Sequence, residues 1–204
     1  MSRGQMKIVI FGSGNGTNAD AILKAEKSGQ LGNAKIVGVF SNIQDSGILK
    51  IADSFSVRKQ IIKLSSNAPF ISKDDAMKII RDLENFKPDL IVLAGFMKVL
   101  PKEFIESCQN MIINIHPSLL PSFKGLRAIE RAFKYGVKIS GCTIHWVSEE
   151  IDGGKIIAQA PVRRMDTDNL EMFRQKIQAA EHMVFPTVIA ELVYEFQNSV
   201  KNKI

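Results

Sequence analysis

The chain has 204 residues, of which 45% are hydrophobic and 24% charged, and its formal net charge is +6. This composition is typical of a folded globular domain and excludes a disordered chain or a disulfide-rich miniprotein. No run reaches the ~18 apolar residues of a membrane helix, and the N-terminus lacks the apolar core of a signal peptide. We therefore expect a cytoplasmic protein that has no membrane partner.

Strand and helix patterns alternate along the first half of the chain. The predicted strands are Lys7–Phe11, Lys35–Phe40, Gln60–Leu64 and Leu90–Ala94, and the helices between them are Asn18–Gly29, Ser46–Phe55 and a segment from Ser72 to Pro88. This order predicts an α/β fold with a doubly wound, mostly parallel sheet and helices on both faces.

The third predicted helix has a recognisable start and an apolar face. Ser72 and Asp75 have the spacing of a capping box, which favours a helix N-terminus at Ser72. The predicted apolar face is Met77, Ile80 and Leu83, flanked by Ile79 and Phe86.

The second half continues the same fold in one domain that spans residues 1–204. Its predicted elements are a helix at Pro101–Ser107, a strand at Met111–Ile115, a loop at Ser118–Gly125, a helix at Ile129–Tyr135, strands at Ile139–Val147 and Lys155–Arg163, and a long helix from about Asp168. The apolar stripe of the long helix is Leu170, Phe173, Ile177, Ala180 and Val184. Pro186 is predicted to kink or break this helix.

A glycine-rich turn, Gly12–Asn18, joins the first strand to the first helix. Glycines let the backbone approach a ligand closely, and a helix N-terminus presents free N–H groups to an anion. The turn has Thr17 where the dinucleotide fingerprint has its last glycine, and it lacks the lysine of a P-loop. NAD and ATP are therefore disfavoured, which leaves a phosphate or carboxylate ligand or a turn without a ligand.

The positive charge is spread along the chain and no basic run has interleaved aromatic residues. We therefore expect small anionic ligands and no nucleic-acid partner. Cys108 and Cys142 lie far apart, so neither a disulfide framework nor a zinc knuckle is indicated. The three histidines have no HxxH or HxH spacing, so we expect no metal site.

Two polar residues, Asn114 and His116, stand at the end of an apolar strand just before Pro117. Strand alternation places both side chains on one face, at the edge where open α/β sheets bind ligands. A carboxamide and an imidazole can together donate two hydrogen bonds to an oxyanion, and the imidazole can carry a proton. The alternative is a structural histidine at a strand end.

Asp152 precedes two glycines in a predicted turn, where a solvated structural role competes with a functional one. In the functional interpretation, the carboxylate lies near His116 and raises its pKa. His145, inside a strand pattern, and His182, inside the long helix, are weaker candidates.

Four segments resemble one known family. These are SGNGTN at Ser13–Asn18, LAGFMKVL at Leu93–Leu100, NIHPSLLP at Asn114–Pro121 and IDGG at Ile151–Gly154. NIHPSLLP with a downstream DGG is similar to the folate-dependent formyltransferases, and SGNGTN to their phosphoribosylglycinamide branch. The resemblance runs from about Lys7 to Leu192.

The resemblance implies a Rossmann-like formyltransferase fold and the transfer of a formyl group from 10-formyltetrahydrofolate to the amine of glycinamide ribonucleotide, without a metal. The catalytic residues it implies are Asn114, His116 and Asp152. The substrate-binding residues it implies are Gly14, Asn15, Gly16, Thr17, Asn18 and Glu181. The folate-binding residues it implies are Lys73, Met97, Lys98, Val99, Leu100 and Asn114.

This assignment divides the chain into a phosphate-binding half, about 7–100, and a catalytic and folate-binding half, about 101–195. The chain departs from the family at Lys98 and in the segment of Lys73, where arginine is common. A lysine keeps a donor but loses the bidentate fork of arginine. Segment 56–72 diverges most from the family.

Three alternatives are left open. A formyltetrahydrofolate hydrolase shares the Asn, His and Asp set, although such hydrolases usually carry an N-terminal regulatory domain, for which we expect no room before Lys7. A methionyl-tRNA formyltransferase would need an additional RNA-binding domain. A non-catalytic anion-binding α/β module would bind ligand without turnover. We expect a monomer or a homodimer.

Overall fold

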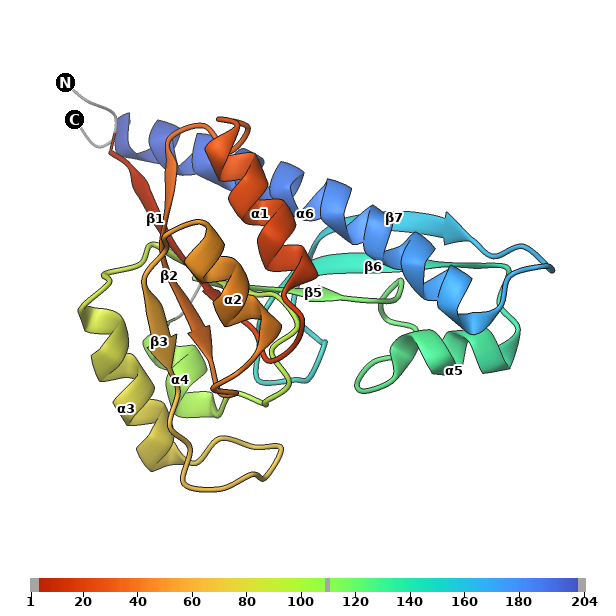
Figure 1. The fold of residues 1–204 in the computed structure, drawn as a ribbon, viewed down its shortest axis with the longest axis horizontal. Coiled ribbons are helices and arrows are strands. Elements are labelled where there is room, and N and C mark those ends of the chain that lie inside the picture. The colour runs from red at the N-terminus through yellow and green to blue at the C-terminus, as the bar shows by residue number, and fades with distance from the viewer. Residues whose placement is uncertain (1–3, 109–110, 202–204) are drawn as a thin grey trace.

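The computed structural model describes residues 4–108 and 111–201, which form a seven-stranded sheet between helices (Figure 1). The strands are β1 (Met6–Phe11), β2 (Ala34–Ser41), β3 (Lys59–Ile61), β4 (Leu90–Leu93), β5 (Ile112–His116), β6 (Ile139–Trp146) and β7 (Ile156–Arg163). The helices are α1 (Thr17–Lys27), α2 (Gly47–Ser54), α3 (Lys73–Glu84), α4 (Lys102–Ser107), α5 (Ala128–Tyr135) and α6 (Leu170–Lys201).

The strand order is β3-β2-β1-β4-β5-β6-β7. The pairs from β3 through β5 are parallel, and β6 and β7 are added to this sheet in antiparallel pairing. The predicted α/β class with a mostly parallel, doubly wound sheet is confirmed. Chain order reverses between β1 and β4, so the carboxyl ends of β1, β4 and β5 meet at one edge, where such sheets bind ligands.

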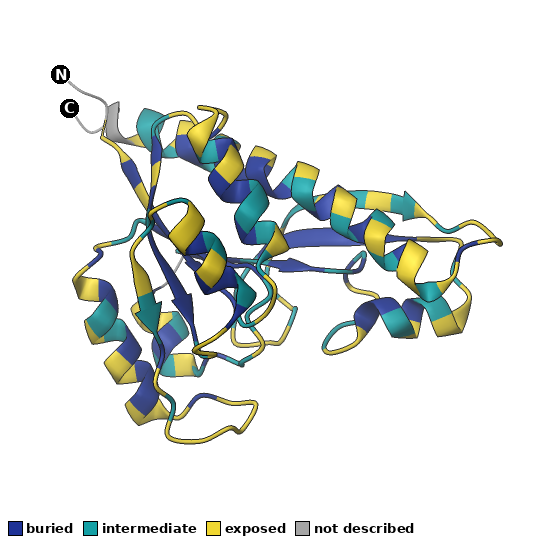
Figure 2. Cartoon of the chain, viewed as in Figure 1, coloured by how far each residue is buried: buried dark blue, intermediate teal, exposed yellow. Residues whose placement is uncertain are grey.

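Helices lie on both faces of the sheet, and Figure 2 shows that its central strands are buried. Alternate residues of one strand enter different core clusters: Ile8 packs with α1, α2 and α6, whereas Val9 packs with α3 and α4. All four residues of β4 are buried, because a central parallel strand has helices on both sides. The core thereby fixes the register in which polar strand ends meet.

The far end of β6 and β7 extends from this core together with α5 and the start of α6 (Figure 1). A separate cluster of Ile129, Ala132, Phe173 and Ile177 joins α5 to α6 there. We call this part of the chain, residues 123–140 and 160–178, the arm.

Two predictions about helices are wrong. In α3 the predicted Leu83 is buried, but the buried face is centred on Ile79 together with Ala76, so that Met77 is exposed and Ile80 only half-buried. In α6 the chain continues past Pro186 without a break, because Phe185, Val188 and Ile189 anchor both sides of the proline in the core. Tertiary burial thus outweighs the local cost of proline.

The predicted cap of the third helix, the third strand and the long helix are confirmed with small shifts. Ser72 caps α3 by accepting a hydrogen bond from the Asp75 amide at 3.2 Å. The third strand is confined to Lys59–Ile61, and the long helix begins at Leu170. Both cysteines are buried free thiols. In the part of the chain that the structure describes, no helix is long and apolar enough to cross a membrane. The division into two halves stays a prediction.

Candidate active site

Asn114 and His116 lie at the C-terminal end of β5, and β6 pairs with this strand in antiparallel orientation. The register sets Asn114 opposite His145 and His116 opposite Thr143. The Asn114 Nδ2 atom lies 3.2 Å from His145 Nε2. This register is consistent with the prediction that Asn114 and His116 share one face of the strand. It also brings His145, a weaker candidate in the sequence, into the site.

The proton of His145 is placed by its neighbours. Its Nδ1 atom lies 2.9 Å from the carbonyl oxygen of Trp146, which can only accept a hydrogen bond, so Nδ1 carries the proton. In the neutral ring Nε2 is then an acceptor, and it receives one N–H of the Asn114 carboxamide. This contact orients Asn114 so that its second N–H and its carbonyl oxygen are the groups available to a ligand.

Asp152 lies in the turn between β6 and β7 with a left-handed backbone, φ 50°. Its Oδ2 atom is 3.2 Å from His116 Nδ1 and accepts a hydrogen bond from the Gly125 amide at 2.8 Å, and its Oδ1 atom is 3.6 Å from His145 Nε2. Its side chain is 10% exposed. The structure therefore excludes the interpretation of Asp152 as a solvated turn residue.

The loop before α5 completes the cluster. The carbonyl oxygen of Phe123 lies 2.9 Å from His116 Nε2. Both ring nitrogens of His116 therefore face oxygen acceptors, Phe123 on one side and Asp152 on the other. Only the doubly protonated imidazolium can donate to both, so this geometry favours the charged form.

Burial acts in the opposite direction and lowers the pKa of His116 below its ordinary value. The Phe123 carbonyl and the Asp152 carboxylate each raise the pKa of His116 and offset part of this effect. Asp152 thus raises the pKa of His116, as predicted, but the net pKa of His116 stays below that of a free histidine. Burial also raises the pKa of Asp152, while its contacts with His145, Gly125 and His116 outweigh that and lower it.

The glycine-rich turn forms a second part of the site. Gly16 is the N-cap of α1 with φ 79°, and a Cβ atom there would lie 2.6 Å from the Cα atom of Ile48. The Ile48 amide donates to the Gly14 carbonyl at 3.1 Å, so the start of α2 packs directly on the turn. Gly14 borders open space instead, because an added Cβ atom would meet nothing within 4 Å.

The turn is joined to the long helix by Asn18, whose Nδ2 atom donates to Glu181 Oε2 at 3.0 Å. Glu181 is buried, and burial raises the pKa of its carboxyl group. The Oδ1 atom of Asn18 is buried without a hydrogen-bond partner among the residues that the structure describes. Such an unpaired acceptor fits a ligand hydroxyl or amide at this position.

Gly14→Ala offers a clean test of this turn. We expect the added methyl group to keep a phosphate away from the backbone and to raise KM for a phosphorylated substrate about 10-fold or more, while KM for a second substrate stays within a few-fold. Gly16→Ala is the matched variant: its left-handed φ costs about 1–2 kcal/mol and its Cβ atom collides with Ile48, so it should lower Tm. An equal rise of both KM values in Gly14→Ala would contradict the assignment.

The segment Met97–Leu100 lies beside the turn, since the Met97 amide donates to Ser13 Oγ at 2.9 Å. Val99 pairs with the chain at Pro69 and Ile71, and Lys98 Nζ donates to the carbonyl oxygens of Asn67 and Ala68 at 2.9 and 2.8 Å. Lys98 thus holds loop 65–71 in place. Lys73 pairs with Glu103 at 3.3 Å, and Leu100 is buried. The folate roles of these residues stay predictions.

Loop 65–71 is closed by the buried carboxylate of Asp75. Its Oδ2 atom accepts hydrogen bonds from Ser65 N at 2.8 Å and Ser65 Oγ at 2.6 Å, and Lys78 Nζ lies 3.0 Å from Oδ1. The hydrogen bonds from Ser65 hold the pKa of Asp75 well below its ordinary range. Asp75 therefore stays ionised in the folded protein even in mild acid.

We expect Asp75→Ala to lower the free energy of unfolding by about 1.5–3 kcal/mol, the contribution of a charge-assisted hydrogen bond. Because the folded pKa is depressed, this contribution is complete above the unfolded pKa of about 3.9 and is lost as pH falls further. Denaturant titrations of both proteins at pH 7 and below pH 4 measure the difference. Asp74→Ala, an exposed neighbour on the same helix, is the control, and equal stability of the two variants would refute the account.

Within residues 4–108 and 111–201, no group of three or more His, Cys, Asp or Glu side chains has the arrangement to hold a metal ion. The cluster of Asn114, His116 and Asp152 contains hydrogen-bond donors and titratable groups. It can stabilise a negative oxygen next to a group that carries a proton.

Comparisons with known proteins find similar sequences and similar structures. Residues 6–189 match the family described as formyl transferase. The phosphoribosylglycinamide formyltransferase of Haemophilus influenzae is 37% identical over 183 residues, which cover 90% of this chain and 85% of that protein. The crystal structure of phosphoribosylglycinamide formyltransferase from Anaplasma phagocytophilum has a TM-score of 0.85 at 39% identity and covers 94% of this chain and 89% of that chain.

A longer relative shares the same region. The trifunctional purine biosynthetic protein adenosine-3 of Gallus gallus is 37% identical over 185 residues. The match covers 91% of this chain and 18% of that protein, so the chain spans less than a fifth of its length.

Proposed function

The chain belongs to the formyl transferase family, and we propose that it transfers the formyl group of 10-formyltetrahydrofolate to the amine of glycinamide ribonucleotide, a step in purine biosynthesis. The observation that carries this proposal is the cluster of Asn114, His116 and Asp152 at the end of β5. The relatives from Haemophilus influenzae and Anaplasma phagocytophilum are named for this activity, and the match covers 85% and 89% of their chains.

Asn114 and His116 have the donors that formyl transfer requires. When an amine attacks the formyl carbon, its carbonyl oxygen becomes negative, and hydrogen-bond donors aimed at that oxygen stabilise the transition state. Asn114 offers the N–H that His145 does not use. His116 in its charged form offers a second donor and a proton.

His116 has to exchange a partner before it can donate to substrate, because both of its nitrogens are engaged within the chain. The neutral Phe123 carbonyl holds an imidazolium less strongly than the Asp152 carboxylate does. We therefore assign the Phe123 contact as the one that is released, so that Nε2 turns to the oxyanion while Asp152 keeps Nδ1 and the ring orientation.

Asp152 contributes to the proton transfers of the reaction through His116. The attacking amine has to lose a proton, and the folate nitrogen has to gain one when it leaves. Asp152 favours the imidazolium of His116, which gives its proton to the leaving folate nitrogen, and the proton lost by the attacking amine then restores the imidazolium. Asp152 acts on His116 and is in this sense a positioning residue.

The glycine turn is proposed to hold the substrate phosphate. The N-terminus of α1 and the backbone of Gly14–Asn18 provide donors without a side-chain charge. Asn18 and Glu181, which are hydrogen-bonded to each other, are suited to the ribose hydroxyls of the same substrate. The two proposed substrates are thus small anions, a ribonucleotide and a folate with carboxylates. We propose that the reaction takes place in the cytoplasm.

Asn114→Ala tests the oxyanion donor. We expect kcat to fall by ~10²–10³-fold, the range for a lost oxyanion-hole donor, with little change in KM for either substrate. Steady-state kinetics with both substrates measure the separation. Asn85→Ala is a matched control because this exposed carboxamide lies at the C-terminal end of α3, away from β5. A rise in KM at constant kcat would show that Asn114 only binds substrate.

The function itself is tested by following the loss of 10-formyltetrahydrofolate with and without glycinamide ribonucleotide. Loss that requires the ribonucleotide, and a formylated product in equal amount, is the expected result. Loss at the same rate without acceptor would instead identify a hydrolase, and no loss with tight binding of both ligands would identify a binding module.

A further inference from the structure

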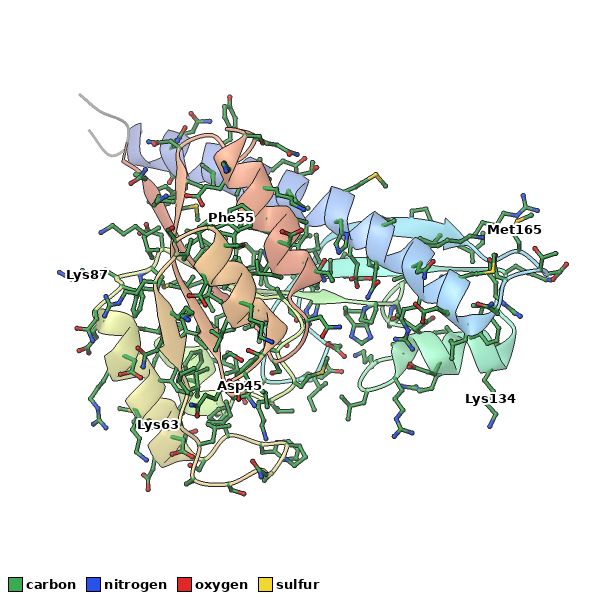
Figure 3. The ribbon with its side chains drawn as sticks, viewed as in Figure 1. Asp45, Phe55, Lys63, Lys87, Lys134 and Met165 are labelled. Carbon is green, nitrogen blue, oxygen red and sulfur yellow. The ribbon has the colours of Figure 1, made fainter. Side chains whose placement is uncertain are left out.

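A pocket lies on the outer face of α5, outside the cluster at the end of β5. Its volume is about 450 Å³, and it is lined by Phe123, Arg131, Lys134 and Tyr135. This volume lies within the range of small-ligand sites. Figure 3 shows Lys134 extending from α5 away from the sheet, toward solvent.

The lining combines two aromatic rings with two cations and no acid. Tyr135 is 80% exposed, and its ring meets the Phe123 ring edge to face, with centroids 5.9 Å apart. The Arg131 guanidinium lies 5.9 Å from the centre of the Phe123 ring and is held by a hydrogen bond to the Lys124 carbonyl. Exposed rings bind planar aromatic groups, and a fixed guanidinium beside an ammonium binds phosphate.

We propose that this pocket binds a mononucleotide, with its base stacked on Tyr135 and its phosphate held by Arg131 and Lys134. A free phosphate would leave the exposed tyrosine ring unused, and an uncharged base would leave both cations unused. A ligand that carries both groups satisfies all four lining residues.

The pocket is connected to the reaction through Phe123. Its ring lines the pocket, while its carbonyl oxygen accepts from His116 Nε2 at 2.9 Å. Phe123 has a left-handed backbone, φ 57°, which is uncommon for a residue with a side chain and needs support from packing. A base packed on the ring stabilises this conformation and the contact with His116. Since His116 has to release Phe123 to act, the nucleotide is an inhibitor.

The charge of the ligand acts on the same histidine. Besides burial, the titratable groups that face His116 are Asp152, which raises its pKa, and His145 and Arg131, which lower it. A phosphate paired with Arg131 offsets the effect of that cation. The pKa of His116 therefore rises when the pocket is filled.

Binding is tested by calorimetric titration with AMP, adenosine and inorganic phosphate. AMP should bind more tightly than either fragment, and Tyr135→Ala and Lys134→Gln should each weaken AMP about 10-fold or more. Matched controls are Tyr194→Ala, the other exposed tyrosine, and Lys138→Gln, an arm lysine that pairs with Asp166, and both should bind AMP like the wild type. Unchanged AMP affinity in Tyr135→Ala and Lys134→Gln, or loss of AMP binding in Gly14→Ala, would overturn the proposal.

Inhibition is tested separately, because this step rests on the proposed function whereas binding does not. AMP should lower kcat of the wild type without competing with glycinamide ribonucleotide, and Lys134→Gln should resist it. NMR titration should show the His116 pKa rising with AMP. Competition between AMP and the ribonucleotide, or AMP binding with unaltered kcat and unaltered His116 pKa, would refute the link to His116. If the protein shows no formyl transfer activity but still binds AMP through Tyr135, only the proposed function is contradicted.

Discussion

His116→Ala is expected to lower kcat by ~10²–10⁴-fold, the range for a lost general acid or base, while KM for both substrates changes little. The negative oxygen that His116 stabilises exists mainly in the transition state, so its loss appears in kcat. Steady-state kinetics at saturating concentrations of both substrates provide the measurement.

Two comparisons make the His116 result specific. His182→Ala removes a half-buried histidine outside the cluster and should leave kcat near the wild-type value. The double variant Asn114→Ala with His116→Ala should lose less than the product of the two single effects, because both donors serve one oxygen. Full activity in His116→Ala would return this histidine to a structural role at the strand end.

Asp152→Asn is expected to fold normally, to bind both substrates within a few-fold, and to lose ~10²–10⁴-fold in kcat. The substitution keeps the size of the side chain but removes the carboxylate that faces His116 Nδ1 at 3.2 Å. Since Asp152 raises the pKa of His116, the pKa of His116 should fall in the variant. NMR titration of the His116 ring in both proteins measures this shift.

The same shift sets the pH dependence of the reaction. Burial lowers the pKa of His116 below 6.5, and activity that needs the imidazolium declines as pH rises through that pKa. In Asp152→Asn this decline in kcat/KM should move to lower pH. Asp53→Asn, an exposed carboxylate on α2 that pairs with Lys59, should leave the profile unchanged. A profile of Asp152→Asn that coincides with the wild-type profile would contradict the coupling of Asp152 to His116.

The parts of the fold that local sequence patterns determine could be predicted. The apolar runs of β1 and β4 and the alternation with helices indicate a parallel sheet, and the Ser72 cap marks the start of α3. The position of Asn114 and His116 follows from strand alternation and from Pro117. These features depend on residues close together in the sequence, where steric and hydrogen-bonding rules act directly.

The features that escaped prediction depend on contacts between distant segments. His145 enters the site only because β6 pairs antiparallel with β5, and a strand pattern does not specify its neighbour. The hydrogen bond from the Gly125 amide to Asp152 joins two loops 27 residues apart, and the contact of His116 with Phe123 depends on how the chain between them folds back. The pKa of His116 reflects a balance between burial and these contacts, so its net direction also required the structure.

The fate of the formyl group can be followed in one measurement. We propose a single-turnover reaction with 10-formyltetrahydrofolate labelled with ¹³C in its formyl group, followed by NMR in the presence of glycinamide ribonucleotide. The account predicts that the label appears in the formamide of the product, with little in formate, and that His116→Ala slows this step. Label that appears in formate at a rate independent of the ribonucleotide would contradict formyl transfer to the amine.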